Sequence, residues 1–430
     1  MSQAGKSTTR IQYIDGLKLI MCYMIMLIHF SIAYFPVGFI SYGSTYQAEE
    51  RIPAFWAGLP YSIYTNSPFP LHVFFALVAL LPTIAFYRSQ DPYASLQRQA
   101  IKRYFRFLLP VGGAIIGTSL LHSWGLLDFK NLAALNNSPW CLSIEPKDMS
   151  LPALFYNAFI QCYFENGGDI LTVMWCMYII FLGSMLTLAL LALFGSSPFR
   201  KWLYLASIPL LLAYPTYAAF IVGIACGDFY VHKFPQISLS QSQRSCLSWL
   251  LLGLSIIIGY MPDFLFPAPI TPFYAYAVAS GLFILSLMFN SFLQGILSKP
   301  FLVHHAQYSF SVLLVHIWVL AGFSQSIYQQ LQSLANNHLL SFTLCFIICM
   351  VITHLLAMAF YQLFEKPSQA LANSIYGSVK SPTQNGKAPY FLASASLIKL
   401  MESTLTAPSM KLASKYKANS LLFTIHAPTC

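Results

Sequence analysis

The 430-residue chain is 57% hydrophobic and 8% charged, with a formal net charge of +10. Soluble domains average about 25% charged residues, so this composition excludes an ordinary soluble protein and a disordered one. The 23 basic residues are scattered along the chain and form no basic domain, so we expect no nucleic-acid partner. The composition therefore indicates a polytopic membrane protein, which is embedded in the lipid bilayer.

Ten apolar segments are candidates for membrane-spanning helices, because about 20 apolar residues cross a hydrocarbon core of about 30 Å. The fifth and sixth form one apolar run, which we divide at Tyr214-Pro215 because proline breaks a helix and disfavours helix at the residue before it. The pattern predicts an all-α polytopic membrane bundle of about ten transmembrane helices. In chain order they lie at 16–37, 66–87, 105–125, 170–195, 199–213, 214–231, 246–262, 271–292, 308–330 and 339–364.

Basic residues are distributed unevenly between the two sides that these spans define. If the N-terminus is cytosolic, 20 of the 23 Lys and Arg residues face the cytosol, and only Arg51, Lys130 and Lys147 face the opposite side. Cytosolic loops of membrane proteins are enriched in Lys and Arg. The charge asymmetry therefore predicts a multi-pass protein with both termini in the cytosol, in an endomembrane or the plasma membrane.

Outside the spans, two segments differ in character. Residues 1–375 are predicted to form the membrane domain, and the Ser-, Ala- and Lys-rich residues 376–430 a mobile cytosolic tail; the stretch 389–405 is also compatible with a weak interfacial helix. The long loop 126–169, on the non-cytosolic side, carries Cys141 and Cys162. These predict either a disulfide in an oxidising compartment or two free thiols. No cysteine spacing indicates a metal site.

The first span carries three ionisable residues, Asp15, Lys18 and His29. Eleven residues make three helical turns plus about 20°, so Lys18 and His29 share one face about 16 Å apart, and Asp15 is close enough to pair with Lys18. Ionisable residues inside spans are functional candidates. The alternative is a Lys18 that snorkels to the interface beside Asp15, with His29 as a packing residue.

Later spans add further titratable side chains. In the ninth, Ser309 and His316 are seven residues apart and share a face; in the tenth, His354 and Glu365 are eleven apart and aligned. The second and third spans contribute His72 and His122. Several histidines inside one bundle favour acid–base chemistry near neutral pH, and equally a proton relay in a transporter.

Six short motifs, in order over residues 8–372, resemble those of the acyltransferase-3 family of ten-span membrane O-acyltransferases, fungal members in particular. The opening Asp-Gly-Leu-Lys, followed by ten residues and then a histidine, is similar to the family's first helix, which usually has Arg in place of Lys. The matching segments are Ile11–Lys18 with His29, Phe74–Leu77, Arg103–Pro110, Trp175–Met177 with Gly183-Ser184, Tyr308–His316 and Glu365–Pro367.

The resemblance implies transfer of an acyl group, commonly acetyl, from acyl-CoA to a hydroxyl of a glycan or a small natural product, as in secondary-metabolite tailoring. Acyl-CoA is then a co-substrate, and no bound cofactor or metal is expected. His29 is the expected general base, with Lys18 and His316 as further catalytic residues. The expected substrate-binding residues are Asp15, Arg103, Arg106, Trp175 and Ser309. The cations at 98–106 either bind the anionic CoA donor or serve only to set the orientation of the chain in the membrane.

Three motif centres depart from the family pattern. Lys18 replaces the usual Arg, so the charge is kept but the two parallel hydrogen bonds that a guanidinium makes are lost. Val78-Ala79 replace the usual Ser-Gly, and Ile180 replaces a glutamate. These departures leave open an inactive homologue, or a transporter whose polar stripe lines a solute path. A transporter built from repeated halves would show corresponding broken helices, and the sequence shows no such match, which favours the enzyme.

Overall fold

The computed structural model describes residues 11–35, 68–147, 149–165, 167–210, 214–260 and 272–380. These residues form helices joined by loops, and none of them lies in a β-strand. The chain divides into two units, Met1–Ile375 and Tyr376–Cys430, and the description below concerns the first. The predicted all-α fold is confirmed.

The long helices of the first half are α1 (Gln12–Tyr34), α3 (Pro68–Arg88), α4 (Pro92–Ser123) and α9 (Trp175–Phe194). The second half is built from α10 (Arg200–Leu210), α11 (Ala218–His232), α12 (Gln241–Tyr260), α14 (Pro272–Phe289), α17 (Ser309–Gly322), α18 (Ser324–Ala335), α19 (His338–Phe360) and α20 (Lys366–Lys380). Short α-helices connect them: α5 (Phe129–Asn136), α6 (Pro139–Ser143), α7 (Leu151–Tyr156), α8 (Cys162–Phe164), α15 (Ser291–Leu297) and α16 (Pro300–His305). The 3₁₀ turns are η4 (Thr172–Met174), η5 (Pro215–Tyr217), η6 (Phe234–Gln236) and η7 (Ala306–Tyr308), and the π-helical turns are η3 (Asn157–Gln161) and η8 (Tyr361–Glu365).

Among the described residues, six helices are long and apolar enough to cross a membrane, or eight if each sharply bent helix pair counts as one span. The bent pairs combine α14 with α15, at 95°, and the α16–α17 segment with α18, at 55°. The two other predicted spans, 199–213 and 214–231, coincide with α10 and α11, which are only 11 and 15 residues long. Tyr214 lies outside any helix and a 3₁₀ turn begins at Pro215, so the apolar run is broken where the proline predicted it. The polytopic membrane bundle is thus confirmed, and the described residues contain six to eight candidate crossings.

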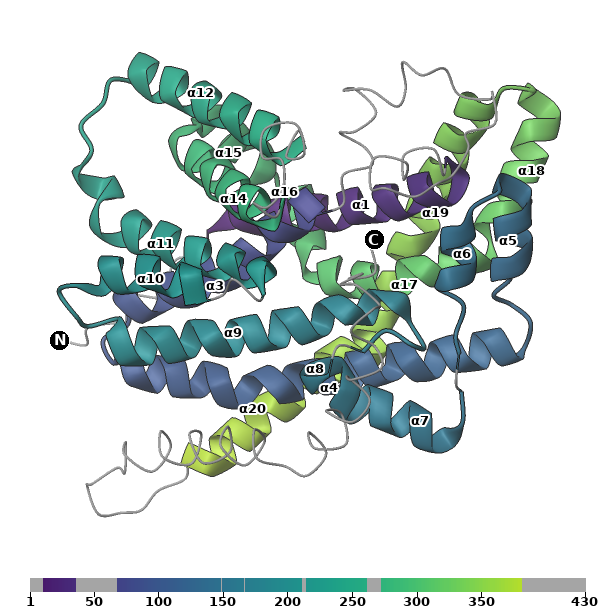
Figure 1. The fold of residues 1–430 in the computed structure, drawn as a ribbon, viewed down its shortest axis with the longest axis horizontal. Helices are drawn as coiled ribbons and strands as arrows, with labels where there is room; N and C mark the ends of the chain where they lie inside the picture. The colour runs from purple at the N-terminus through teal and green to yellow at the C-terminus, as the bar shows by residue number, and fades with distance from the viewer. Residues whose placement is uncertain are drawn as a thin grey trace. The chain divides into compact units, whose positions relative to one another are not determined.

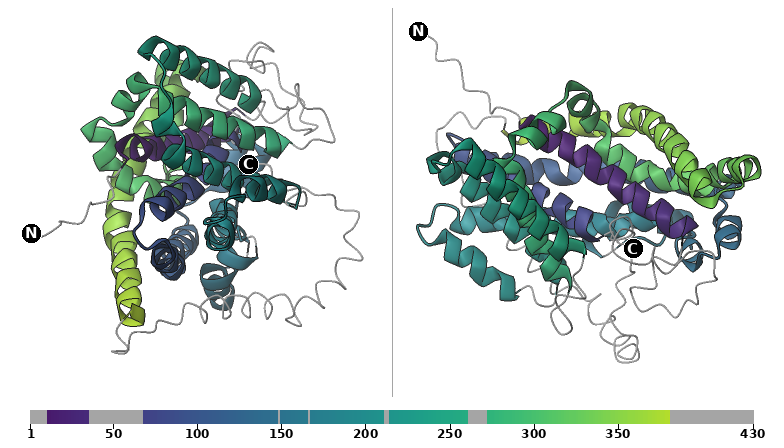
Figure 2. Two further views of the ribbon diagram at one scale, coloured as in Figure 1. Left: turned by 90° about the vertical axis from the view of Figure 1, so that its left-hand side faces the viewer. Right: turned by 90° about the horizontal axis from the view of Figure 1, so that it is seen from above.

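Helix α1 lies between two groups of helices, and each group has its own apolar core (Figures 1 and 2). Its first half contributes Ile14, Leu17 and Met21 to a cluster with α3, α11 and α14. Its second half, from Cys22 onward, belongs to a larger cluster with α4, α9, α17 and α19. Asp15, His29 and Ser31 on α1 are therefore buried within the protein.

Small residues lie at the closest helix contacts. In lipid there is no hydrophobic driving force between helices, so helix association depends on the close packing that small residues allow. A side-chain carbon at Gly223 would lie 2.2 Å from the Ala76 carbonyl oxygen, and one at Gly227 would lie 2.7 Å from Thr83. These glycines let α11 pack directly on the backbone of α3. In the family motifs, Gly183 likewise faces the ring of Phe220, where a side-chain carbon would come within 2.2 Å.

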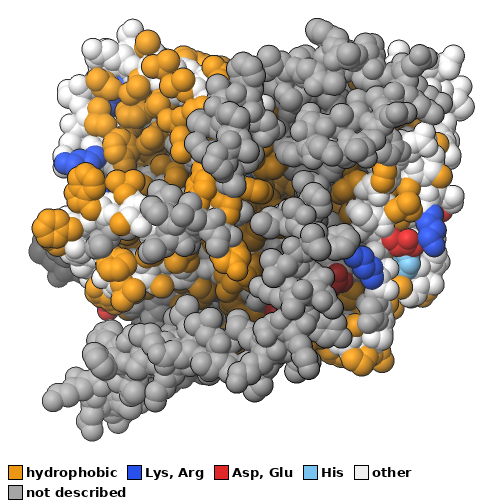
Figure 3. Space-filling view, in the orientation of Figure 1, with side chains coloured by type: hydrophobic (Ala, Val, Ile, Leu, Met, Phe, Trp, Pro, Cys, Tyr) orange, Lys and Arg blue, Asp and Glu red, His pale blue; other side chains and the backbone are white. Residues whose placement is uncertain are grey.

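Helices α12 and α14 are joined by polar contacts rather than by a large apolar core. The hydroxyl of Ser255 donates to the Ala279 carbonyl at 2.8 Å, and that of Ser248 donates to the Ser286 carbonyl at 3.1 Å. The outer face of α12 exposes large side chains such as Trp249. Figure 3 shows hydrophobic side chains gathered over this side of the molecule, which is the surface expected of helices that face lipid.

The segment 126–169 does not form the open polar loop that the sequence suggested. It folds into α5 to α8 with η3, and Trp140, Cys141 and Tyr163 are buried in the larger core cluster. The hydroxyl of Ser138 donates to the Ile32 carbonyl near the end of α1 at 3.0 Å. This segment therefore covers the second half of α1.

Gly16, in the Asp-Gly-Leu-Lys motif, offers a test of this packing. A side-chain carbon there would lie 2.0 Å from the backbone carbonyl oxygen of Leu297 at the end of α15, so Gly16→Ala requires one helix to move. We expect destabilisation of about 1–3 kcal/mol, typical of overpacking, measured as a lower unfolding midpoint in detergent. Gly253→Ala in α12 is the matched control, because nothing lies within 4 Å of its added carbon. A Gly16→Ala protein as stable as the control would contradict the close α1–α15 contact.

Candidate functional site

The structure brings His29 and His316 into direct contact, although 287 residues separate them in the chain. His29 Nδ1 lies 2.7 Å from His316 Nε2, the ring planes differ by 4° and the ring centres are 5.0 Å apart. This centre-to-centre distance is about the sum of the N···N distance and the two ring radii, so the rings lie end to end in one plane. That is the geometry of a straight hydrogen bond. His29 is 4% exposed and His316 0%.

The hydrogen bonds of this pair show which nitrogen of each neutral imidazole ring carries the hydrogen. His316 Nδ1 lies 3.2 Å from the carbonyl oxygen of Val312, one turn earlier on α17. A carbonyl oxygen only accepts, so this nitrogen carries a hydrogen and His316 Nε2 accepts. His29 Nδ1 must then be the donor between the rings, which leaves a lone pair on His29 Nε2. That nitrogen makes no hydrogen bond to a described residue, so it is available as a base.

The indole of Trp140 covers one face of the His29 ring. The two rings are nearly parallel at 15°, with centres 5.5 Å apart. Trp140 comes from the short helix α6, and the Ser138–Ile32 hydrogen bond just before it fixes this helix against α1. None of the six family motifs includes Trp140. The sequence does show Ser138-Pro139-Trp140, which is a typical helix start, within the predicted long loop 126–169.

Lys18 and Asp15 form the ion pair that the spacing predicted, with Lys18 Nζ 2.7 Å from Asp15 Oδ1. The Lys18 side chain is 28% exposed, whereas that of Asp15 is 12% exposed. They lie in the first turns of α1, and Lys18 is about 16 Å from His29 by helix rise. The cation therefore lies near the start of α1, far from the histidine pair.

The other predicted site residues lie apart from the pair. Ser309 begins α17 and donates its hydroxyl hydrogen to the Ala306 carbonyl at 2.7 Å. Arg103 and Arg106 lie on α4, half-buried and exposed respectively, and neither makes a hydrogen bond or ion pair with a described residue. Trp175 begins α9 and packs half-buried against the larger core cluster.

His354 is not aligned with Glu365 in one site, because the π-helical turn η8 interrupts the helix before Glu365. Glu365 accepts a hydrogen bond from the Ser311 hydroxyl at 2.9 Å. His354 instead lies in a second polar chain: its Nδ1 is 2.6 Å from the Tyr23 hydroxyl and its Nε2 is 2.6 Å from His305 Nδ1. Tyr23 and His305 escaped the sequence analysis because neither shares the spacing of a motif.

The two remaining span histidines do not join either group. His72 Nδ1 is hydrogen-bonded to the Pro68 carbonyl on its own helix, at 2.6 Å. His122 contacts the ring of Phe129. Within the described part of the chain, no three His, Cys, Asp or Glu side chains are arranged to hold a metal ion.

Cys141 and Cys162 are both free thiols, which decides between the two alternatives for this structure. The thiol of Cys162 donates to the Asn157 side-chain oxygen at 3.2 Å. Burial raises the pKa of both thiols to about 12, so they stay protonated and unreactive at neutral pH.

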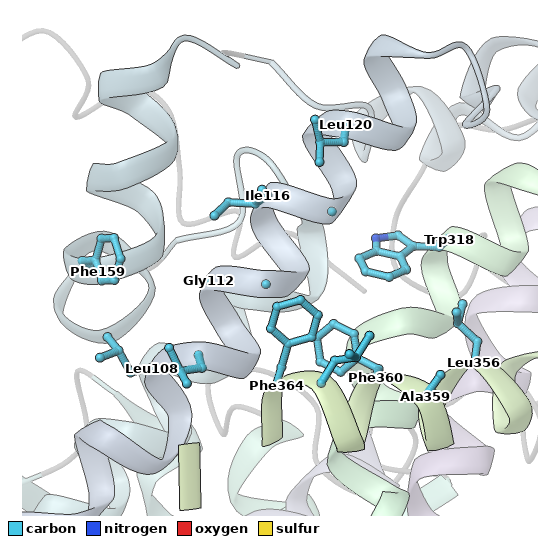
Figure 4. A pocket seen from close by; sticks show the side chains of 14 residues that line it. Leu108, Gly112, Ile116, Leu120, Phe159, Trp318, Leu356, Ala359, Phe360 and Phe364 are labelled. Atoms are coloured by element: carbon cyan, nitrogen blue, oxygen red, sulfur yellow. The ribbon is translucent and has the colours of Figure 1, made fainter. Parts of the chain in front are cut away.

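One cleft in the described part of the chain is lined by no titratable side chain. It lies between α4 and the α17–α19 segment and has a volume of about 360 Å³ (Figure 4). Its lining is apolar and includes Gly113, Trp318 and Phe364. Trp318 donates its indole hydrogen to the Thr118 hydroxyl at 2.8 Å. The cleft offers no acid or base for chemistry on a hydroxyl.

The proton assignment predicts a specific tautomer for His29. In protein labelled with ¹⁵N-histidine, we expect the His29 signals to show a protonated Nδ1 and an unprotonated Nε2 at neutral pH. Comparison with the spectrum of His29→Gln assigns the signals. In His316→Phe the acceptor is lost, and the preference for this tautomer should disappear; His316→Gln keeps an acceptor oxygen and should retain it. A protonated Nε2 in the native protein would contradict the assignment.

The histidine pair, the Asp15–Lys18 ion pair and five of the six motifs lie within the segment matched by one family model, and the sixth motif, Glu365–Pro367, follows just after it. The acyltransferase-3 model, described as an acyltransferase domain, matches residues 11–362. Comparisons with curated proteins and with solved structures find no match. The matched segment is more than half of the chain and includes both His29 and His316. The resemblance seen in the sequence is confirmed: the chain belongs to the acyltransferase-3 family.

Proposed function

We propose that this protein transfers an acyl group, acetyl in the simplest case, from acyl-CoA to a hydroxyl of a small natural product or glycan. Family membership supports acyl transfer in general. The observation that carries the proposal for this chain is the His29–His316 pair, which leaves His29 Nε2 as an unprotonated base inside the bundle. A base of this type is what activation of a hydroxyl requires.

In the proposed reaction, His29 Nε2 removes the proton of the acceptor hydroxyl as its oxygen attacks the thioester carbonyl. The tetrahedral intermediate collapses, the carbon–sulfur bond breaks, and the imidazolium returns its proton to the departing CoA thiolate. His316 stays hydrogen-bonded to His29 Nδ1 throughout and stabilises the positive charge that develops on the ring. The Val312 carbonyl holds His316 in the orientation that this role needs.

The donor is proposed to approach from the basic side of the bundle, which we take to be cytosolic together with both termini. Arg103 and Arg106 make no hydrogen bond or ion pair with a described residue there, although Arg106 lies near enough to Glu365 for their charges to interact. Both are proposed to meet the CoA phosphates. Lys18, held by Asp15 at the same end of α1, is a further donor-binding cation. The pantetheine arm then extends along α1 toward His29, about 16 Å deeper by helix rise.

Transfer of label from [¹⁴C]acetyl-CoA to an extract of hydroxyl-bearing metabolites tests the proposal. The purified protein should label an acceptor, and His29→Ala should lower kcat by roughly 10²–10⁴-fold, the usual contribution of a general base. His72→Ala is the matched control, because His72 is an equally buried span histidine outside the pair, and it should keep its activity.

Full activity in folded His29→Ala protein would refute the assignment of the base. Solute flux through reconstituted vesicles, without label transfer for any acyl-CoA, would favour the transporter and contradict the enzyme.

The proposed donor contacts predict a different kinetic pattern. Arg103→Gln and Arg106→Gln should raise the KM for acyl-CoA more than they lower kcat, because phosphate contacts act equally on the bound donor and on the transition state. Lys299→Gln, an exposed cation on the same predicted side but outside the cluster 98–106, is the control and should change neither constant. If the two variants lower only the amount of protein in the membrane, these cations orient the chain and do not bind the donor.

A further inference from the structure

A second cleft, away from the histidine pair, lies between α10 and α11 and has a volume of about 290 Å³. Its walls are mostly apolar and include Leu205, Val222, Ala225 and Phe229. Helix α10 is 11 residues long and exposes Trp202, which is 72% accessible. A short amphipathic helix with an outward tryptophan is typical of the membrane interface.

Two lysines, Lys201 and Lys233, lie at the rim of this cleft. Both are exposed, and neither makes an ion pair or hydrogen bond with a described residue. They come from the start of α10 and the end of α11, on the side of the bundle predicted to face the cytosol. The cleft therefore combines an apolar trough with two free positive charges at one end.

The acid that lines the cleft does not cancel these charges, because it is already paired. Arg200 binds Asp228 through Nε at 3.1 Å and Nη2 at 3.0 Å, and His232 Nδ1 lies 2.7 Å from the same carboxylate. Asp228 is 3% exposed. This bidentate contact also joins the first turn of α10 to α11, so it holds the two walls of the cleft at a defined distance.

We propose that this cleft binds one anionic phospholipid of the adjoining leaflet. The headgroup phosphate lies between Lys201 and Lys233, and an acyl chain lies in the apolar trough along α11. Charge complementarity and the amphipathic lining select this occupant: a neutral lipid leaves both lysines unpaired, and a soluble anion leaves the trough empty. Basic pockets between helices at the cytosolic side are a recognised form of anionic-lipid site.

Native mass spectrometry of the full-length protein, titrated with phosphatidylserine or with phosphatidylcholine of identical chains, tests the proposal. We expect the wild type to retain phosphatidylserine in preference to phosphatidylcholine. Lys201→Gln combined with Lys233→Gln should weaken phosphatidylserine binding roughly tenfold or more, since each cation near an anionic surface contributes to affinity. Ala225→Phe, which fills the trough from an exposed position, should also weaken binding while both charges remain.

Lys299→Gln combined with Lys366→Gln is the matched control, because it removes two exposed lysines elsewhere on the same predicted side, and it should bind like the wild type. Equal retention of the two lipids by the wild type would overturn the proposal. So would an equal loss in the control pair, or unchanged binding in Ala225→Phe. Displacement of phosphatidylserine by stoichiometric palmitoyl-CoA, or by millimolar inorganic phosphate, would assign the cleft to those anions and also overturn it.

Discussion

The hydrogen bond between His29 Nδ1 and His316 Nε2 gives each of two buried imidazole rings a partner inside the helix bundle. An unpartnered polar group inside a membrane bundle costs several kcal/mol, so each ring needs its partner for the helices to pack as they do. The same bond determines chemistry, because the Val312 carbonyl orients His316 and His316 in turn orients His29. One interaction thus stabilises the α1–α17 contact and leaves a basic nitrogen on α1.

The surrounding structure keeps this pair enclosed. Helix α1 belongs to both core clusters, and the segment that follows α4 folds back over its second half and places Trp140 on the His29 ring. Close backbone contacts at Gly16 and Gly223 bring the neighbouring helices near enough to exclude lipid. The glycine of the Asp-Gly-Leu-Lys motif is therefore explained by packing, whereas the aspartate and lysine of the motif form an ion pair near the start of α1.

The sequence was sufficient to predict the helical membrane bundle, the break near Pro215 and the Asp15–Lys18 pair, because these follow from local composition and helical spacing. It named both histidines but not their contact, because no periodicity along one helix reports which residue of another helix it meets. Trp140, Tyr23 and His305 were missed for the same reason. The sharp bends after α14 and α17 lie inside apolar segments that the sequence predicted as single spans, so composition alone did not indicate them.

The central claim is that His29 and His316 act as one unit, and a double-mutant cycle on acyl transfer tests it most directly. Residues that act together are strongly non-additive. We therefore predict that the protein carrying both His29→Ala and His316→Ala has about the same kcat as His29→Ala alone, since His316 works only through His29. If the two losses multiply in the double variant, the histidines act independently and the paired mechanism is wrong.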